Sequence, residues 1–224
     1  MSENDKRPRN SEVTKAAILD AARTAFAENS YDVVGLREIA RVAEVNVSLV
    51  IRYFGSKERL FSVCLEEAAF DALLRDVPRE RLAEVLGRFA LHRHPSDETM
   101  PSADDGMDAQ DIAACYRVCR MLICSINSRM AAPLIRARLE SDLLYHLVER
   151  IGGSHAREKG RLVLALLIGL ALTRGVLDGD GTRGGVVKAD SVDSPHRAPD
   201  GHVHLAESLL KVIIDDIPIN PDRA

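Results

Sequence analysis

Apolar residues recur at i, i+3, i+4 and i+7 in two short stretches, which predicts amphipathic helices over residues 36–43 and 47–54. The repeating residues should face the core: Leu36, Ile39, Ala40 and Ala43 in the first helix, and Val47, Val50, Ile51 and Phe54 in the second. Only Glu44, Val45 and Asn46 connect them, and Asn46 is a good N-cap for the second helix. A third helix is predicted to start at Ser56, its cap.

Two short helices joined at a sharp angle by three or four residues are typical of the helix-turn-helix, whose second helix enters the DNA major groove. The side of the second helix away from the predicted core carries groups suited to that contact: Ser48, Leu49, Arg52 and Tyr53. Lys57 lies in the first turn of the next helix, where a phosphate can bind. The alternative interpretation is a plain helical hairpin with a solvated face.

The rest of the chain predicts an all-α fold, because no run of alternating β-branched residues occurs. Further helices are expected over residues 56–75, 79–92, 108–127, 134–151, 155–177 and 203–217, with loops over 93–107 and 178–201. We predict a disordered N-terminal arm (1–10), a three-helix helix-turn-helix DNA-binding domain (11–56), and a larger helical effector-binding and dimerisation domain (57–224).

Residues 14–61 resemble the N-terminal domain of the TetR family of transcriptional repressors. The resemblance is carried by Thr14-Lys15-x-x-Ile18-Leu19-Asp20-Ala21-Ala22, Phe26 to Asp32, Arg37-Glu38-Ile39-Ala40, and Ile51-Arg52-Tyr53-Phe54-Gly55-Ser56-Lys57-Glu58-x-Leu60-Phe61. It implies a ligand-responsive regulator that binds a palindromic operator in double-stranded DNA as a homodimer. The predicted DNA-binding residues are Thr14, Arg37, Asn46, Val47, Ser48, Leu49, Arg52, Tyr53 and Lys57.

Four positions depart from the family pattern, and the mildest change is Asn29, which stands where the family often has Gly after the first helix. Leu36 stands where the family has a capping Thr, which leaves Gly35 as a weaker cap. Glu44 stands where the family often has Gly, in the turn. Ile51 stands where the family commonly has a Tyr that contacts phosphate, so Arg52 or Tyr53 would have to replace that contact.

Charge limits the mode of DNA binding. The chain carries a net charge of −4, but residues 1–60 hold ten Lys and Arg against nine Asp and Glu, which leaves −5 for the remainder. A protein that binds nucleic acid without sequence preference is expected to be strongly basic. We therefore expect weak non-specific binding and an operator affinity that depends on a few placed contacts.

The predicted helices 155–177 and 203–217 are candidates for a dimer interface. The first is apolar all round and the second is amphipathic, so together they suggest a surface shared with another copy. The resemblance implies a homodimer built from two such helices in each subunit. The alternative is that these helices complete the core of a monomer.

The resemblance also implies a small-molecule effector of unknown identity, held in a mostly apolar cavity. The candidate lining residues are Phe70, Phe89, Tyr116, Cys119, Arg120, Ile123, Tyr145 and Leu166. Each could instead be ordinary core. A regulator with no effector, whose second domain only dimerises, also remains open.

We predict that the four cysteines are small core residues of a cytoplasmic protein. The alternative is that they act as a redox or metal sensor. No motif typical of a hydrolase, metalloprotease or nucleotide-binding enzyme occurs, so we expect no catalysis, cofactor or bound metal. The N-terminus has no apolar signal region, and the longest apolar run, 162–172, is too short to span a bilayer. We expect no membrane partner.

Overall fold

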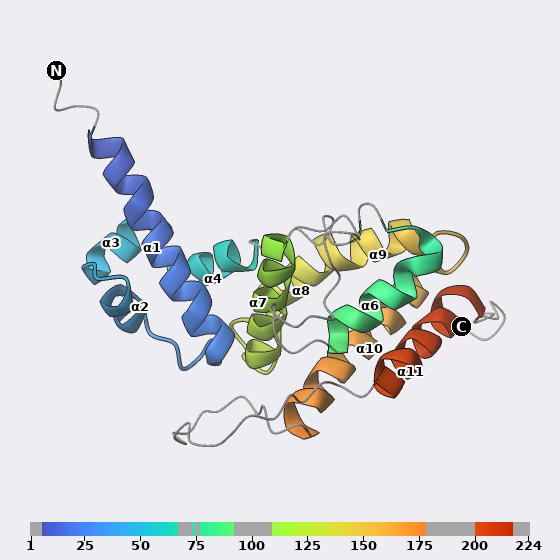
Figure 1. Cartoon of the computed structure of the whole chain (residues 1–224). Coiled ribbons are helices and arrows are strands. Elements are labelled where there is room, and N and C mark those ends of the chain that lie inside the picture. The colour runs from blue at the N-terminus through green and yellow to red at the C-terminus, as the bar shows by residue number, and fades with distance from the viewer. Residues whose placement is uncertain (1–5, 67–73, 75–76, 92–108, 178–199, 217–224) are drawn as a thin grey trace. The chain divides into compact units, whose positions relative to one another are not determined.

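A computed structural model describes residues 6–66, 74, 77–91, 109–177 and 200–216, which are helical with short connections and contain no strand (Figure 1). The predicted all-α class is confirmed. The chain divides into two compact units: unit 1 comprises residues 1–68 and 117–138, and unit 2 comprises residues 69–116 and 139–224. This division differs from the predicted boundary after residue 56, because residues from the middle of the chain pack with the N-terminal helices.

Unit 1 is built around α1, which packs against both α2 and α4, while α3 contacts α2 and α4, and α8 packs on α4. The helices are α1 (Lys6–Glu28), α2 (Leu36–Val42), α3 (Val47–Phe54), α4 (Lys57–Leu65), α8 (Ala132–Arg138) and the C-terminal half of α7 (Ala109–Ser125). The predicted helices over 36–43 and 47–54 are therefore confirmed to within a residue.

Three aromatic rings fix the core of unit 1. Phe26 stacks on Tyr31 with ring centroids 6.0 Å apart, and Phe61 meets both rings edge-on at 4.9 and 5.1 Å. Ile18 and Leu60 of unit 1 are also fully buried. Buried aromatic pairs contribute about 0.5–1.5 kcal/mol beyond the burial of their area.

The first helix begins earlier than predicted. Residues 6–10, assigned to a disordered arm from their polar sequence, form the first turns of α1. Pro8 does not prevent this, because the first four N–H groups of a helix have no intrahelical acceptor and proline is tolerated in the first turn.

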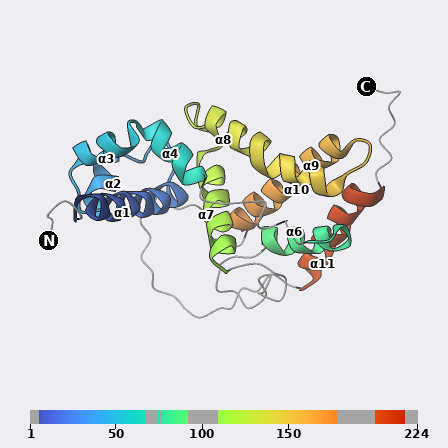
Figure 2. The ribbon, with the colours of Figure 1, turned by 90° about the horizontal axis from the view of Figure 1, so that it is seen from above.

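Unit 2 contains η1 (Arg79–Arg81), α6 (Leu82–Leu91), the first half of α7, α9 (Leu144–Ile151), α10 (Ala156–Leu177) and α11 (Asp200–Lys211). A π-turn precedes α9 (Leu139–Leu143) and another follows α11 (Val212–Asp216). Helix α11 packs against α6, and α10 packs against α9 and α6 (Figure 2). The α6–α11 approach is close at Gly87, where an added Cβ would lie 3.1 Å from Cγ of Glu207 and would make that side chain shift by a few tenths of an ångström.

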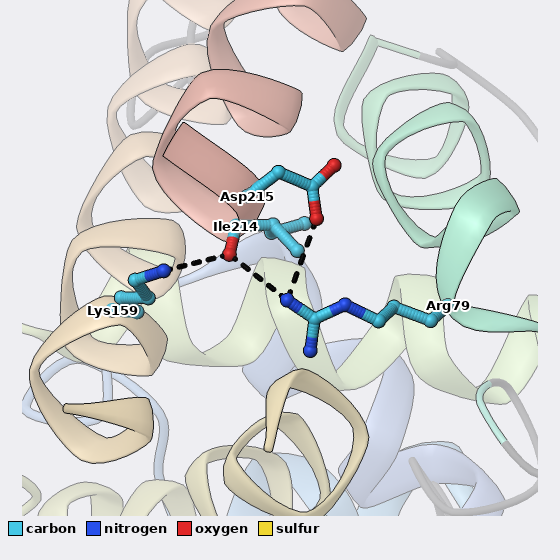
Figure 3. Close-up of polar contacts among 4 residues, drawn as sticks. All are labelled: Arg79, Lys159, Ile214 and Asp215. Carbon is cyan, nitrogen blue, oxygen red and sulfur yellow. Dashed lines mark hydrogen bonds and ion pairs between the residues drawn. The ribbon is translucent and has the colours of Figure 1, made fainter. Parts of the chain in front are cut away.

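Two cations hold the end of the last helical segment (Figure 3). Lys159 Nζ donates to the Ile214 carbonyl at 2.9 Å, and Arg79 Nη2 donates to the same oxygen at 3.3 Å and to Asp215 at 3.4 Å. The last carbonyls of a helix lack intrahelical partners and carry partial negative charge. The two side chains therefore fix this end against η1 and α10.

Several predicted elements fall outside the described residues: the helix continuing over 67–75 apart from Leu74, the loop over 93–107, and the insertion up to residue 199. Of the predicted effector residues, Phe70 also lies outside them. Within the described ranges, no helix combines the length and apolarity needed to cross a membrane.

Candidate nucleic-acid interface

The turn between α2 and α3 begins with a Schellman motif. The Glu44 N–H donates to the Arg41 carbonyl at 3.2 Å, and the Val45 N–H donates to the Ala40 carbonyl at 2.9 Å. Glu44 adopts φ +54°, the left-handed conformation that usually selects glycine at this position. A non-glycine residue there costs about 1–2 kcal/mol, which the surrounding turn must offset.

Local caps then set the direction of α3. The Asn46 side chain accepts from the Ser48 N–H at 2.9 Å, as predicted for an N-cap. Val50 and Phe54 are 1% and 7% exposed and anchor the helix in the core of unit 1. Gly55, at φ +78°, ends the helix. The helix is therefore held by its buried side and by both ends, which leaves its opposite side open.

The open side of α3 carries Val47, Ser48, Ile51 and Arg52, which we call the reading face. Ser48 and Arg52 are exposed and Val47 is half-buried. The prediction that Ile51 faces the core is wrong, because its side chain is 50% exposed. Ser48, Ile51 and Arg52 follow the i, i+3, i+4 spacing of one helical face, and Val47 lies one turn before Ile51 at its edge.

Two groups of the reading face can form hydrogen bonds with base edges. The Arg52 guanidinium suits the paired acceptors of guanine, and the Ser48 hydroxyl can donate or accept. Asn46 is less suited to a base contact than predicted. Reading adenine needs both its amide oxygen and its amide nitrogen, and the oxygen already caps α3.

Two lysines flank α3, each beside a tyrosine ring. Lys57 Nζ lies 4.3 Å from the centre of the Tyr31 ring, and burial lowers the pKa of Lys57 against the opposing effects of Asp32 and Glu58. Lys15 Nζ on α1 lies 5.8 Å from the centre of the Tyr53 ring. Lys15 was absent from the predicted set, since only the fold brings α1 beside the end of α3.

Tyr31 also joins the corner after α1 to the first turn of α4. Its hydroxyl donates to Glu58 Oε1 at 2.9 Å. Burial, followed by the bond to Glu58, raises the pKa of the Tyr31 hydroxyl. The pKa of Glu58 is lowered by hydrogen bonds from its own backbone N–H, from Ser56 and from Tyr31. The start of α4, where Lys57 lies, is thus fixed by a charged hydrogen bond.

The other predicted DNA-binding residues lie around α3 with different degrees of exposure. Thr14 is half-buried on α1, and Arg37 is exposed in the first turn of α2. Leu49 and Tyr53 are half-buried on the flanks of α3, between its core side and the reading face. No side-chain hydrogen bond caps α2 at Gly35, in agreement with the weak cap expected there.

Residues about 95 positions away along the chain complete the corner after α1. The buried Ser125 hydroxyl accepts from the Tyr31 N–H at 3.0 Å. The Ser128 hydroxyl donates to Asp32 at 2.8 Å. Both serines belong to unit 1 although they lie at and beyond the end of α7. Sequence reasoning missed them, because a serine at the end of a helix carries no local sign of a distant partner.

Two arginines bind backbone carbonyls near helix ends in unit 1. Arg120 Nε on α7 donates to the Ala27 carbonyl near the end of α1 at 3.3 Å. Arg138 Nε at the end of α8 donates to the Leu65 carbonyl at the end of α4 at 3.0 Å. Such contacts satisfy orphan carbonyls and complement the negative helix end. We call Arg120, Ser125, Ser128 and Arg138 the helix-end supports of unit 1, because each bonds the end of a helix or the corner that follows it.

The cysteines lie in settings that disfavour reactive thiolates. Cys64 and Cys115 are fully buried. Burial raises the pKa of Cys119 to about 12, and it also raises that of Cys124, whose thiol lies 3.5 Å from the Ala27 carbonyl. A reactive thiol needs a lowered pKa. Within the described ranges, no three His, Cys, Asp or Glu side chains gather as metal ligands.

The described members of the predicted effector set do not share one environment. Phe89, Tyr116 and Leu166 are half-buried in unit 2, whereas Cys119, Arg120 and Ile123 belong to unit 1. Tyr145, in unit 2, is 54% exposed and packs edge-on against the neighbouring His146 ring. Arg120 already bonds the end of α1.

Unit 2 carries a row of exposed apolar side chains. Leu205, Leu209 and Val212 are 60%, 47% and 48% exposed and follow i, i+4, i+7 spacing, which places them in one row. We call this the apolar row. Leu162 on α10 is 46% exposed. Single exposed apolar residues are ordinary, but a row of them is typical of a surface that another molecule covers.

Two family descriptions match separate parts of the sequence. Residues 18–64 match "Bacterial regulatory proteins, tetR family", and residues 107–181 match "Tetracyclin repressor-like, C-terminal domain". The chain is 30% identical over 160 residues to the HTH-type transcriptional repressor Rv3405c of Mycobacterium tuberculosis and to the HTH-type transcriptional regulator Mb3439c of Mycobacterium bovis. Each match covers 62% of this chain and 84% of the relative.

Solved structures share the fold at lower sequence identity. NalD, the secondary repressor of the MexAB-OprM multidrug efflux pump in Pseudomonas aeruginosa, matches with a TM-score of 0.57 at 18% identity, over 89% of this chain and 95% of NalD. FadR from Bacillus subtilis, in complex with stearoyl-CoA, matches with a TM-score of 0.55 at 18% identity, over 91% of this chain and 99% of FadR.

Proposed function

The chain belongs to the TetR family of DNA-binding transcriptional regulators, and from this premise we propose that it represses transcription by binding a palindromic operator as a homodimer. The observation that carries the proposal is the reading face of α3. Its anchoring residues Val50 and Phe54 are buried, while Ser48 and Arg52 are open to a major groove. A helix held in this way presents its polar groups to DNA without rearrangement.

The contacts divide into reading and positioning. Arg52 and Ser48 contact base edges, where the pattern of donors and acceptors distinguishes the base pairs. Lys57, at the start of α4, contacts a phosphate, as the N-terminus of a helix and its positive dipole end favour. Arg37 and Tyr53 border the reading face and contact the backbone. The net charge of −4 fits a protein whose affinity rests on these few contacts.

The homodimer is supported by the apolar row, on α11 and the π-helical turn that follows it, and by Leu162 on α10. Covering three or four partly exposed leucine and valine side chains stabilises association, at roughly 25 cal/mol for each Å² of apolar surface removed from water. One reading face spans only a few base pairs. Two-fold pairing doubles the contacts and explains why the operator would be palindromic.

An apolar small molecule that releases the operator is the finer part of the proposal. Phe89, Tyr116 and Leu166 are the predicted lining residues that lie half-buried in unit 2, and α6 packs against α10 there. FadR, which shares the fold, holds stearoyl-CoA. Control by cysteine oxidation is disfavoured, because burial raises the pKa of Cys119 and Cys124. Thiols in all four cysteines suit a cytoplasmic location.

The test starts from promoter DNA adjacent to the protein's own gene, with affinity measured by fluorescence anisotropy over a range of salt concentrations. Arg52→Ala is expected to lower operator affinity by about 1–3 kcal/mol, the value of a bidentate base contact. Lys57→Ala is expected to flatten the dependence of affinity on salt by about one phosphate contact. Arg129→Ala, an exposed arginine of unit 1 outside α3, is the matched control.

Equal affinity and equal salt slope for both variants and the control, on a verified operator, would contradict this docking. A screen of apolar small molecules for release of the labelled operator then tests the effector. If none releases the DNA while the dimer stays intact, unit 2 serves only for dimerisation.

A further inference from the structure

Ile51 is a large apolar side chain placed where a DNA-reading helix meets its ligand. It is 50% exposed, whereas its neighbour Val50 is 1% exposed. It lies between Ser48 and Arg52 on the reading face, and Val47 one turn earlier is half-buried. Its exposure gives it no part in the core of unit 1. An isoleucine also has no donor or acceptor, so it cannot bind a phosphate.

The hydrogen-bonding capacity of this face is limited. Ser48 and Arg52 are the polar side chains of the four-residue reading face. The amide oxygen of the neighbouring Asn46 already caps α3 through the Ser48 N–H. An apolar feature opposite it in the groove would let the apolar part of the face bury its surface when the helix binds. The major groove offers one such feature in ordinary DNA, the C5 methyl group of thymine.

We propose that Ile51, supported by Val47, contacts a thymine methyl group and so selects a thymine in each operator half-site. This inference rests on the proposed function, since it requires α3 to occupy the major groove. It adds a reading rule that hydrogen bonds alone do not give: uracil and thymine present the same O4 acceptor and differ only in the methyl group.

Deoxyuridine substitution tests the rule. Each thymine of a verified operator is replaced in turn by deoxyuridine, which removes one methyl group and leaves base pairing unchanged. At one thymine in each half-site, we expect wild-type affinity to fall about fourfold, the effect of failing to bury one methyl group. Replacing both half-sites should lower it by about fifteenfold.

Variants of Ile51 test whether this residue makes the methyl contact. In Ile51→Ala, the affinity for the thymine operator should fall and the loss on deoxyuridine substitution should disappear, whereas Ile51→Val should keep most of it. Val33→Ala is the matched control, because Val33 is a 76% exposed β-branched residue outside α3. Circular dichroism melts establish that every variant folds, as expected for exposed positions.

Three outcomes overturn the inference. If no deoxyuridine weakens wild-type binding, or if the loss persists unchanged in Ile51→Ala, the methyl contact is absent while operator binding, and with it the proposed function, stands. If the wild-type protein binds no promoter DNA at all, the proposed function fails and the methyl contact fails with it.

Discussion

The aromatic cluster of unit 1 and the apolar row of unit 2 lie in opposite surroundings. In unit 1, Phe26, Tyr31 and Phe61 pack together and are at most 3% exposed. In unit 2, Leu205 and Leu209 lie on the surface at 60% and 47% exposure. The aromatic cluster forms part of a closed core within unit 1, whereas the apolar row is the surface that the proposed homodimer would bury.

Removing an aromatic ring from unit 1 should have the largest effect. Phe61→Ala is expected to lower the free energy of unfolding by about 3–5 kcal/mol, because it leaves a cavity between two buried rings. Urea denaturation followed by circular dichroism measures the loss. Val33→Ala, at an exposed site, should change stability by less than about 0.5 kcal/mol. Similar values for both variants would show that the aromatic cluster is not the core of unit 1.

A charge in the apolar row should act on assembly and leave the fold of each subunit intact. Leu209→Glu is expected to raise the dimer dissociation constant at least a hundredfold, about 3 kcal/mol, because a buried carboxylate would lack a partner. Ser154→Glu places the same charge at an exposed position before α10, outside the apolar row, and should leave the dimer intact. Sedimentation velocity distinguishes the two. A wild-type monomer at micromolar concentration would show that the apolar row is not a dimer interface.

A smaller effect is expected from a single hydrogen bond inside unit 1. Ser125→Ala leaves the buried Tyr31 N–H without its acceptor and should cost about 1–3 kcal/mol of stability. Ser208→Ala in unit 2 removes a hydroxyl that bonds an exposed carbonyl, so it should cost almost nothing. Equal melting temperatures for the two variants would mean that water replaces the lost bond at the corner after α1.

The smallest effect concerns pH. Hydrogen bonds from its own backbone, Ser56 and Tyr31 lower the pKa of Glu58 below its ordinary value of 4.5. A lowered pKa adds stability above about pH 4.5 that is lost as pH falls through the folded-state pKa. Tyr31→Phe removes one of these bonds. The stability difference between wild type and Tyr31→Phe should therefore shrink from pH 7 to pH 3, and a constant difference would exclude this linkage.

Local signals in the sequence were enough to predict α3 and its caps. Asn46 and Ser56 cap the helices they precede, because capping depends on neighbouring residues. The orientation of Ile51 was mispredicted for a different reason. Its spacing fits a core stripe, but the core contacts of α3 cover a narrower arc centred on Val50 and Phe54. Only packing against other helices decides which edge of a stripe stays exposed.

Contacts between distant parts of the chain could not be predicted. The helix-end supports join residues that lie 73 to 96 positions apart. From the sequence alone, Arg120 and Arg138 would be expected to be solvated surface side chains. The Lys159 and Arg79 contacts to Ile214 are equally non-local. Such bonds depend on tertiary arrangement, which hydrophobic periodicity does not encode.

The helix-end supports also have a consequence for modular engineering. A chimaeric regulator made by fusing residues 1–66 to a foreign effector domain would lack Arg120, Ser125 and Arg138. The carbonyls of Ala27 and Leu65 and the N–H of Tyr31 would then lose their partners. The unit to be transferred is discontinuous, because unit 1 comprises residues 1–68 and 117–138. A fusion partner must therefore supply groups equivalent to the helix-end supports, or be joined outside both of these segments.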